Sequence, residues 1–175
     1  MRLLEHRRHS RRDPTGPHLS PEGIALARRV GATLEPFDRV VVSPKPRAVE
    51  TAVEMGLQVD AEVPELGTMP DDVGFPLDPA TLTSFEEYAS LFSRSEAMRS
   101  YARAQEEVWL RELRRLPDGG RLLMVSHGGM IESGAVAAWG DAAASWGPVL
   151  GYLEGVRFYR EGTHWIRGEV LRVSR

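Results

Sequence analysis

The sequence contains no cysteine among its 175 residues. This absence excludes disulfides, thiolate zinc sites, iron–sulfur clusters and cysteine nucleophiles. Lysine is nearly absent too, because Lys45 is the single lysine among 22 basic side chains. The formal net charge is -3, so the overall field gives no reason to expect a nucleic-acid partner. The sequence also lacks an apolar run long enough for a membrane span and the apolar stretch of a signal peptide, so we expect a cytoplasmic protein without a membrane partner.

What the sequence does contain is typical of a folded domain. Hydrophobic residues make up 42% and charged residues 27%, which predicts a single globular domain over residues 1–175. The charge is unevenly distributed. The first twelve residues hold one acid, Glu5, and five arginines: Arg2, Arg7, Arg8, Arg11 and Arg12. This local excess of positive charge near the N-terminus needs an explanation.

Strand and helix patterns alternate along the chain. Helix periodicity begins after Ser20, a favourable N-cap, and Pro21, which suits a first helical position. Strands are predicted over residues 2–8, 39–43, 57–63 and 122–125, helices over 21–34, 48–56, 85–92, 98–116 and 130–139, and a hairpin over 156–173. This order predicts an α/β fold, a three-layer α/β/α sandwich whose mostly parallel central sheet has an antiparallel edge.

Residues 66–82 show no regular period and contain three prolines. Loops of this length are uncommon in compact domains and are often lids or binding segments. We therefore expect a small cap or lid insertion around residues 66–100.

Three loops that follow predicted strands carry chemically useful side chains. They contain Arg8-His9-Ser10, residues 43–47 with Arg47, and Ser126-His127-Gly128-Gly129. In open α/β sheets these loops meet beyond the carboxyl ends of the strands, where ligands bind. Two histidines and two arginines beside helix N-termini suit a phosphoryl group. A metal site is less favoured, because the arginines would repel the cation and no third ligand stands at matching spacing.

Four motifs in this order resemble the histidine phosphatase superfamily, in its phosphoglycerate mutase-like phosphatase branch. Residues 8–10 (RHS) are similar to the family's Arg-His-Gly signature, and residues 19–23 (LSPEG) to its Leu-Thr-x-x-Gly helix start. Residues 43–52 (SPKPRAVETA) resemble Ser-Pro-x-x-Arg-Ala-x-x-Thr-Ala, and residues 125–129 (VSHGG) resemble Val-x-His-Gly-Gly. Each motif lies at a predicted strand-to-helix junction, and the resemblance implies a phosphoglycerate mutase-like fold.

The resemblance implies that His9 attacks phosphorus to give a phosphohistidine, which water then hydrolyses. Arg8 and Arg47 would hold the phosphoryl oxygens, because a planar guanidinium offers paired donors. His127 would add a further catalytic donor. Ser10, which replaces the family's glycine, and Ser43 are further candidates for binding the phosphate.

The proton donor to the leaving group is less well determined. Relatives place an acid either directly after the second histidine, where this chain has Gly128, or after the third strand, where it has Glu65. We predict Glu65 as the general acid, which requires a raised pKa, with Glu62 and Asp71 as alternatives. The polar strand before the signature also leaves His6 as a rival nucleophile.

We therefore expect a metal-independent phosphomonoester hydrolase, that is, a phosphatase without a cofactor, acting on a small-molecule or protein phosphate ester. One alternative is a phosphoglycerate mutase-type phosphotransferase, and another is a non-catalytic phospho-ligand binding or scaffold protein. Trp139 and Trp146 flank a stretch rich in glycine and alanine, and they are candidates for a contact patch in a homodimer.

Overall fold

The protein forms one six-stranded sheet, with the strand order β3-β2-β4-β1-β5-β6. The computed structural model describes residues 1–68 and 81–174. The strands are β1 (Arg2–Arg8), β2 (Arg39–Val42), β3 (Ala61–Glu62), β4 (Arg121–Ser126), β5 (Gly155–Glu161) and β6 (His164–Leu171). The first four are parallel, whereas β5 runs antiparallel to β1 and to β6. The predicted α/β class, with an antiparallel edge, is confirmed.

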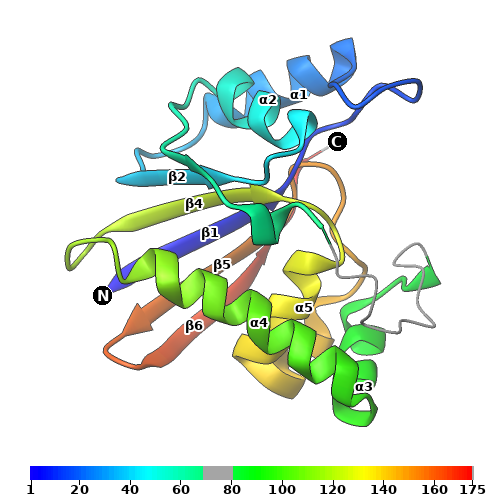
Figure 1. Ribbon diagram of the computed structural model, residues 1–175, viewed down its shortest axis with the longest axis vertical. Helices are drawn as coiled ribbons and strands as arrows, with labels where there is room; N and C mark the ends of the chain where they lie inside the picture. Colours follow the sequence, from blue (N-terminus) through cyan, green and yellow to red (C-terminus); the bar gives the residue numbers. More distant parts are fainter. Residues whose placement is uncertain (69–80, 175) are drawn as a thin grey trace.

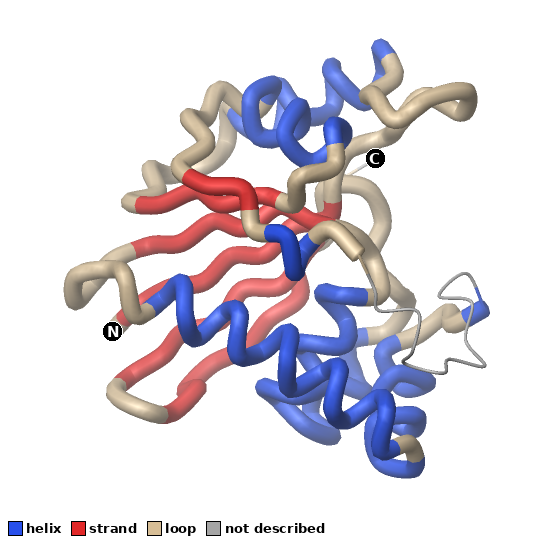
Figure 2. The backbone as a smooth tube through the Cα atoms, viewed as in Figure 1, coloured by secondary structure: helices blue, strands red, loops and turns tan. Residues whose placement is uncertain are grey.

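Helices cover both faces of the sheet, as Figure 1 shows. The α-helices are α1 (Pro21–Gly31), α2 (Pro46–Glu54), α3 (Phe85–Arg94), α4 (Glu96–Leu113) and α5 (Met130–Trp139), with 3-10 helices η1 (Pro64–Leu66) and η4 (Gly140–Trp146). Helices α1 and α2 lie on one face, and α4 and α5 lie on the other (Figure 2). The hydroxyls of Ser20, Ser84 and Ser95 cap α1, α3 and α4 by accepting backbone N–H bonds.

The alternation of side chains in β4 divides the core into two. Leu123 and Val125 pack in the cluster under α1 and α2, together with Ala27 and Ala52. Leu122 and Met124 point the other way, into the cluster that contains Trp109 and Ile131. This central strand is buried on both faces, which explains its continuous apolar sequence.

The polar side chains of β1 form ion pairs and hydrogen bonds inside the protein, although His6 Nδ1 and Arg8 Nε have no hydrogen-bond partner among the described residues. Glu5 is fully buried and pairs with Arg7 of its own strand and with Arg157, which lies opposite it on β5. His6 points to the opposite face, where it is hydrogen-bonded to the Ser126 hydroxyl and lies edge-on against Trp109. The polar residues that distinguish β1 from an ordinary apolar strand therefore form a buried polar network.

Several element boundaries differ from the sequence-based expectation, and packing explains two of them. The predicted strand over residues 57–63 is reduced to Ala61–Glu62, because Leu57 and Val59 pack against the core beside α2 before the chain joins the sheet. Helix α1 ends at Gly31, whereas the prediction continued to residue 34. A Cβ on Gly31 would lie 2.3 Å from the Met55 carbonyl oxygen, so the close contact with the end of α2 fixes this end of the helix.

Trp139 and Trp146, the residues of the expected contact patch, pack mainly against the core. Both indole rings are partly buried and pack against Phe158 of β5. Trp146 also meets Phe85 edge-on, so these two aromatic residues close the core under α3 and α5. A homodimer contact at these two residues stays a prediction.

Of the predicted cap, residues 69–80 lie outside the described residues. The described part that follows packs into the body of the protein: α3 contributes Tyr88 and Leu91 to a third apolar cluster, in which Val136 of α5 also lies. Helix α3 is therefore part of the layer that contains α4 and α5.

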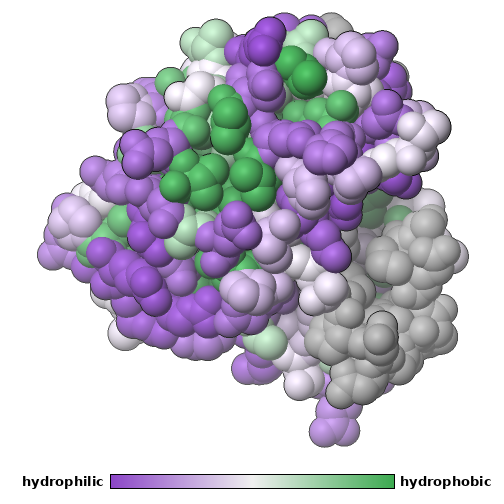
Figure 3. Space-filling view, turned by 45° about the horizontal axis from the view of Figure 1, so that its top comes forward, coloured by the Kyte–Doolittle hydropathy of each residue, from purple (hydrophilic) through white to green (hydrophobic). Residues whose placement is uncertain are grey.

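The surface is mainly polar. Figure 3 shows hydrophilic residues over most of one face, with hydrophobic atoms gathered in its upper half. The large apolar side chains exposed among the described residues are Met1, Val53 and Ile166, and scattered exposure of this kind is ordinary. Within the described ranges, no helix has both the length and the apolar character needed to cross a lipid bilayer.

Gly23 allows α1 to approach the loop after β1. A Cβ built on Gly23 would lie 2.0 Å from the Arg11 carbonyl oxygen, a backbone atom that cannot move without shifting the loop. We expect Gly23→Ala to lower the free energy of unfolding by about 1–3 kcal/mol through overpacking. The measurement is urea unfolding. Gly16→Ala in the same loop is the control, because no described atom lies within 4 Å of that Cβ; equal unfolding free energies for the two variants would contradict the explanation.

Candidate active site

A cavity of about 400 Å³ lies at the carboxyl ends of β1, β2 and β4, and we call it the catalytic cavity. Its walls come from the three loops that the sequence singled out, together with α3, α5 and the loop before β5. The lining residues are Arg8, His9, Arg12, Arg47, Leu82, Tyr88, His127, Gly128, Gly129, Glu132, Val149 and Tyr152. The structure therefore brings four of the predicted residues together: Arg8, His9, Arg47 and His127.

The ring of His9 is held in one orientation. Its Nδ1 lies 2.6 Å from the Ser10 carbonyl oxygen, which can only accept, so Nδ1 carries the proton. Nε2 is then the nitrogen with a free electron pair, and it accepts a hydrogen bond of 3.1 Å from Arg47 Nε. A backbone carbonyl thus selects the tautomer that presents Nε2 to the arginines.

Arg47 joins the two histidines. Besides its bond to His9, its Nη2 donates over 3.2 Å to Nδ1 of His127. His127 therefore carries its proton on Nε2, which donates to the Ser43 hydroxyl at 2.8 Å. Ser43 is fully buried, so its role is to orient His127; the expected direct contact with a phosphate is corrected.

Arg8 reaches the cavity from the end of β1. Its Nη1 donates to the Leu150 carbonyl at 2.6 Å, and its guanidinium lies 4.9 Å from the centre of the Tyr152 ring. Arg8 Nε is buried and has no hydrogen-bond partner among the described atoms. The arginine is thus fixed in place while part of its donor capacity is unused.

Burial and positive charge together favour neutral histidines. Burial lowers the pKa of His9 to about 4, and the charges of Arg47, Arg8 and Arg12 act in the same direction against the opposing effect of the Ser10 carbonyl. Burial lowers the pKa of His127 to about 3, with a further contribution from Arg47. Burial also lowers the pKa of Arg47, as do the charges of Arg12 and Arg8. An anion would relieve this crowding of positive charge.

Ser10 does not line the cavity. Its hydroxyl donates to the Gly23 carbonyl at 2.7 Å, and its backbone N–H donates to the Thr51 hydroxyl at 2.9 Å. The Thr51 hydroxyl in turn donates to the Arg47 carbonyl at 2.6 Å. The prediction of Ser10 as a phosphate ligand is therefore corrected: Ser10 and Thr51 connect the loop of His9 to the helix of Arg47.

The structure does not support Glu65 as the general acid. Glu65 Oε1 lies 2.7 Å from Arg111 Nη1 of α4, and the side chain is 47% exposed. This hydrogen bond lowers the pKa of Glu65, whereas a general acid needs a raised pKa. The prediction is corrected because the Glu65 carboxylate is paired with Arg111 of α4 and does not line the catalytic cavity.

The sequence left three further residues open: Glu62 and Asp71 as the general acid, and His6 as the nucleophile. Glu62 is exposed on β3 and does not line the catalytic cavity. Asp71 lies outside the described residues. The rival nucleophile His6 is completely buried between β4 and Trp109, and burial lowers its pKa to about 3. A substrate cannot reach His6 in this position.

Sequence reasoning missed Glu132, which lies beneath the site. Its carboxylate accepts the N–H of Gly129 at 2.7 Å and that of Leu150 at 2.9 Å, and burial raises its pKa. Leu150 is the residue whose carbonyl holds Arg8, so Glu132 positions this arginine through the chain. A lone acid in the otherwise apolar helix after His127 was the available signal. Sequence reasoning also assigned no role to two other residues of the cavity wall. One is Arg12, which belongs to the N-terminal arginine cluster, and the other is Tyr152, which lies in a loop without a motif.

These pKa values predict that mild acid leaves the protonation of His9 and His127 unchanged. Because the pKa of His9 is about 4, its imidazole stays neutral from neutral pH down to about pH 5, whereas an ordinary histidine would be mostly protonated there. We expect the ring resonances of His9 and His127 in NMR spectra to remain in the neutral form over this range and to titrate below it. A midpoint near 6.5 for His9 would show that the described burial does not hold in solution.

The sheet order and the position of the site define the class as an α/β protein whose cavity lies at the carboxyl ends of its parallel strands. Residues 4–71 match the family model of the histidine phosphatase superfamily (branch 1), which confirms the resemblance for the part of the chain that carries His9 and Arg47. No curated protein gives a significant match.

Three solved structures show the same fold over almost the whole chain. A phosphoserine phosphatase from Entamoeba histolytica aligns with a TM-score of 0.72 at 16% identity, covering 99% of this chain and 98% of that one. A mycobacterial glucosyl-3-phosphoglycerate phosphatase aligns with a TM-score of 0.71 at 21% identity, with full coverage of both chains. A phosphoglycerate mutase from Bacillus anthracis aligns with a TM-score of 0.64 at 14% identity, covering 98% and 92%. At 14–21% identity, these structures show the fold of this chain.

Proposed function

We propose that the protein is a metal-independent phosphomonoester hydrolase that acts through a phosphohistidine on His9. The observation that carries this proposal is the orientation of His9, whose unprotonated Nε2 faces the guanidinium of Arg47 at 3.1 Å. An unprotonated ring nitrogen beside fixed cations combines a nucleophile with a site for the anion that it attacks.

In the proposed first step, the Nε2 electron pair of His9 forms a bond to phosphorus while the bond to the ester oxygen breaks. Arg8, Arg12 and Arg47 offset the negative charge on the remaining phosphoryl oxygens. His127, predicted as a further donor, instead donates to Ser43 and accepts from Arg47, so its role here is to position Arg47. In the second step water attacks phosphorus, the P–N bond breaks, and inorganic phosphate and neutral His9 are released. Two easier steps replace one difficult displacement.

The leaving group influences which esters react well. An aryl alcohol leaves as a stable phenolate without protonation, so we expect aryl phosphates to be turned over with the described residues as they stand. Alkyl esters need a proton at the leaving oxygen, and Glu65 faces Arg111. Small-molecule and protein phosphate esters both remain substrate classes for this site.

One observation favours the non-catalytic alternative. Glu132 is the one carboxyl among the described residues that line the catalytic cavity, and backbone N–H groups occupy both of its oxygens. A phospho-ligand binding protein would need the arginines of this site and no acid. Turnover therefore decides between the two functions.

The test is hydrolysis of an aryl phosphate, such as 4-nitrophenyl phosphate, by the wild-type protein with excess chelator. We expect turnover that the chelator does not reduce. A requirement for added metal would overturn the metal-independent mechanism. Binding of inorganic phosphate without turnover of any ester in a broad panel would favour the binding protein, and transfer of the phosphoryl group to an added alcohol in preference to water would favour the phosphotransferase.

A further inference from the structure

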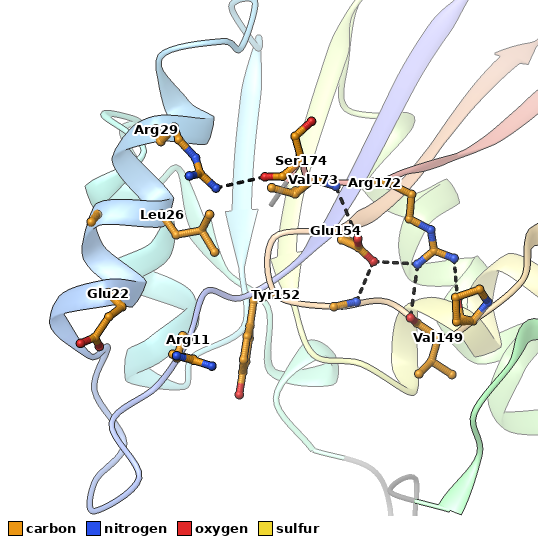
Figure 4. Close-up of a pocket in the computed structure, with 13 residues that line it drawn as sticks. Arg11, Glu22, Leu26, Arg29, Val149, Tyr152, Glu154, Arg172, Val173 and Ser174 are labelled. Atoms are coloured by element: carbon orange, nitrogen blue, oxygen red, sulfur yellow. Dashed lines mark hydrogen bonds and ion pairs between the residues drawn. The ribbon is translucent and has the colours of Figure 1, made fainter.

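A second and larger cavity, of about 920 Å³, lies next to the catalytic cavity, and we call it the side cavity. One wall is α1, with Leu26 and Arg29, and the other is the loop before β5 together with the last described residues, Val173 and Ser174 (Figure 4). Tyr152 and Val149 line both cavities. The volume falls in the range of about 300–1,000 Å³ that is typical of small-molecule sites.

Tyr152 forms the partition between the two cavities. Its ring centre lies 4.9 Å from Arg8 Cζ and 6.0 Å from Arg11 Cζ, and 6.0 Å from the ring centre of His9. Arg8 belongs to the catalytic cavity and Arg11 to the side cavity. A group attached to a phosphate at His9 would therefore meet the Tyr152 ring first and reach the side cavity beyond it.

The wall opposite α1 is fixed and electrically balanced. Arg172 donates to Glu154 at 2.7 Å and also to the carbonyls of Trp146, Pro148 and Val149. Glu154 in turn accepts the N–H of Gly151 at 2.9 Å. Arg172 and Glu154 neutralise each other, and their hydrogen bonds go to backbone groups of the same wall. The pair therefore shapes the cavity and contributes little net charge to it.

The charged groups that remain have a positive balance. The lining includes two cations, Arg11 and Arg29, and one further acid, Glu22, which lies on α1 with Arg29. The Arg11 guanidinium makes no hydrogen bond within residues 1–68 and 81–174, and the Arg29 guanidinium donates one, to the Ser174 carbonyl at 3.2 Å. Between these cations the lining includes the apolar side chains of Leu26 and Val173. An apolar wall between two available guanidinium groups suits an apolar group that ends in an anion.

We propose that the side cavity binds the alcohol part of the substrate, and that this part is an apolar chain or ring carrying a carboxylate. The proposal rests on the proposed function, because it places the phosphate of the same molecule at His9. The apolar part would cover Leu26 and Val173, and the carboxylate would bind Arg29. The substrate class is then a phosphate monoester of a long hydroxy acid.

The test compares three phosphate esters: phenyl phosphate, decyl phosphate, and the phosphate ester of 10-hydroxydecanoate. We expect wild-type kcat/KM to be higher for the hydroxydecanoate ester than for decyl phosphate, which has the same kind of alkyl leaving group. Arg29→Gln should reduce its advantage over decyl phosphate about tenfold, the effect of losing one charge-assisted hydrogen bond. Leu26→Trp should lower kcat/KM for both long esters relative to phenyl phosphate, since the indole would fill the cavity.

Arg28 provides the matched control. It neighbours Arg29 on α1 but is 68% exposed and pairs with Glu54 of α2, away from the side cavity. Arg28→Gln and Arg28→Trp should leave all three kcat/KM ratios unchanged. If Arg29→Gln and Leu26→Trp also leave the ratios unchanged, the proposed site is wrong.

Binding of decanoate separates this inference from the proposed function. We expect NMR shift changes at Leu26, Tyr152 and Val173 on adding decanoate, which Leu26→Trp abolishes and Arg28→Trp keeps. Shift changes without turnover of phenyl phosphate would support the side cavity and overturn the hydrolase. Turnover of phenyl phosphate without decanoate shifts and without any preference for the hydroxydecanoate ester over decyl phosphate would support the hydrolase and overturn the side cavity.

Discussion

Replacing His9 by alanine is expected to lower kcat for an aryl phosphate by at least about a thousandfold, the scale of losing an enzymatic nucleophile. His9 Nε2 is the ring nitrogen that the Ser10 carbonyl leaves unprotonated, and it lies among Arg8, Arg12 and Arg47. The variant retains these arginines, so it should still bind inorganic phosphate. The measurement is steady-state hydrolysis together with phosphate binding by calorimetry.

The same variant should fail to form a phosphoenzyme. A phosphorus–nitrogen bond is labile to acid and stable to base, so wild-type protein quenched in base during turnover of a radiolabelled ester should retain label and lose it in acid. His164→Ala, on the exposed β6 end of the hairpin, is the control and should label normally. Base-stable label on His9→Ala, or its loss in His6→Gln, would assign the nucleophile to another residue.

Replacing Arg47 by lysine should lower kcat/KM by about a hundredfold to a thousandfold, the usual effect of removing a preorganised donor. Arg47 uses Nε toward His9 and Nη2 toward His127, at 3.1 and 3.2 Å. A lysine ammonium carries the same charge at a single point and cannot span both rings. The substitution therefore removes the two directed hydrogen bonds to His9 and His127 and keeps the positive charge.

The control for Arg47→Lys is Arg28→Lys, a change of the same kind on the neighbouring helix. It should leave kcat/KM within about twofold, because exposed ion pairs contribute little. Inorganic phosphate, as the probe of ground-state binding, should lose less affinity in Arg47→Lys than kcat/KM loses. Activity of Arg47→Lys close to wild type would show that charge alone is sufficient at this position.

The N-terminal arginine cluster divides among separate roles. Arg7 pairs with buried Glu5, and Arg2 binds the turn near Asp118. Arg8 and Arg12 line the catalytic cavity, and Arg11 lines the side cavity. These five residues are neighbours in sequence, yet they face a buried network, a turn and two cavities.

The sequence predicted the layers of the fold because hydrophobic periodicity is local. The run from Leu122 to Val125 required a strand covered on both faces, and the Ser20-Pro21 pair located the start of α1 to the residue. The ends of parallel strands meet at one edge of a sheet, so the convergence of His9, Arg47 and His127 also followed from element order.

Side-chain direction was decided by contacts between distant segments. Whether Glu65 faced the site or the solvent depended on Arg111 of α4, which lies 46 positions away in sequence. Ser10 connects two segments and does not bind a ligand, because the Gly23 carbonyl lies within hydrogen-bond distance of its hydroxyl. The type of a residue and its position in the sequence indicate which hydrogen bonds its side chain can form. The packing of other elements against it decides which of these bonds is formed.

The sequence by itself determined the α/β class, the edge of the sheet at which chemistry is placed, and the residue types available there, since these follow from periodicity and chain order. The tertiary structure alone decided the tautomers of His9 and His127, the place of Glu132 under Arg8, and the side cavity beside Tyr152. The physical reason is that hydrogen bonds and cavities depend on distances of a few ångströms between segments far apart in the chain, and folding fixes those distances.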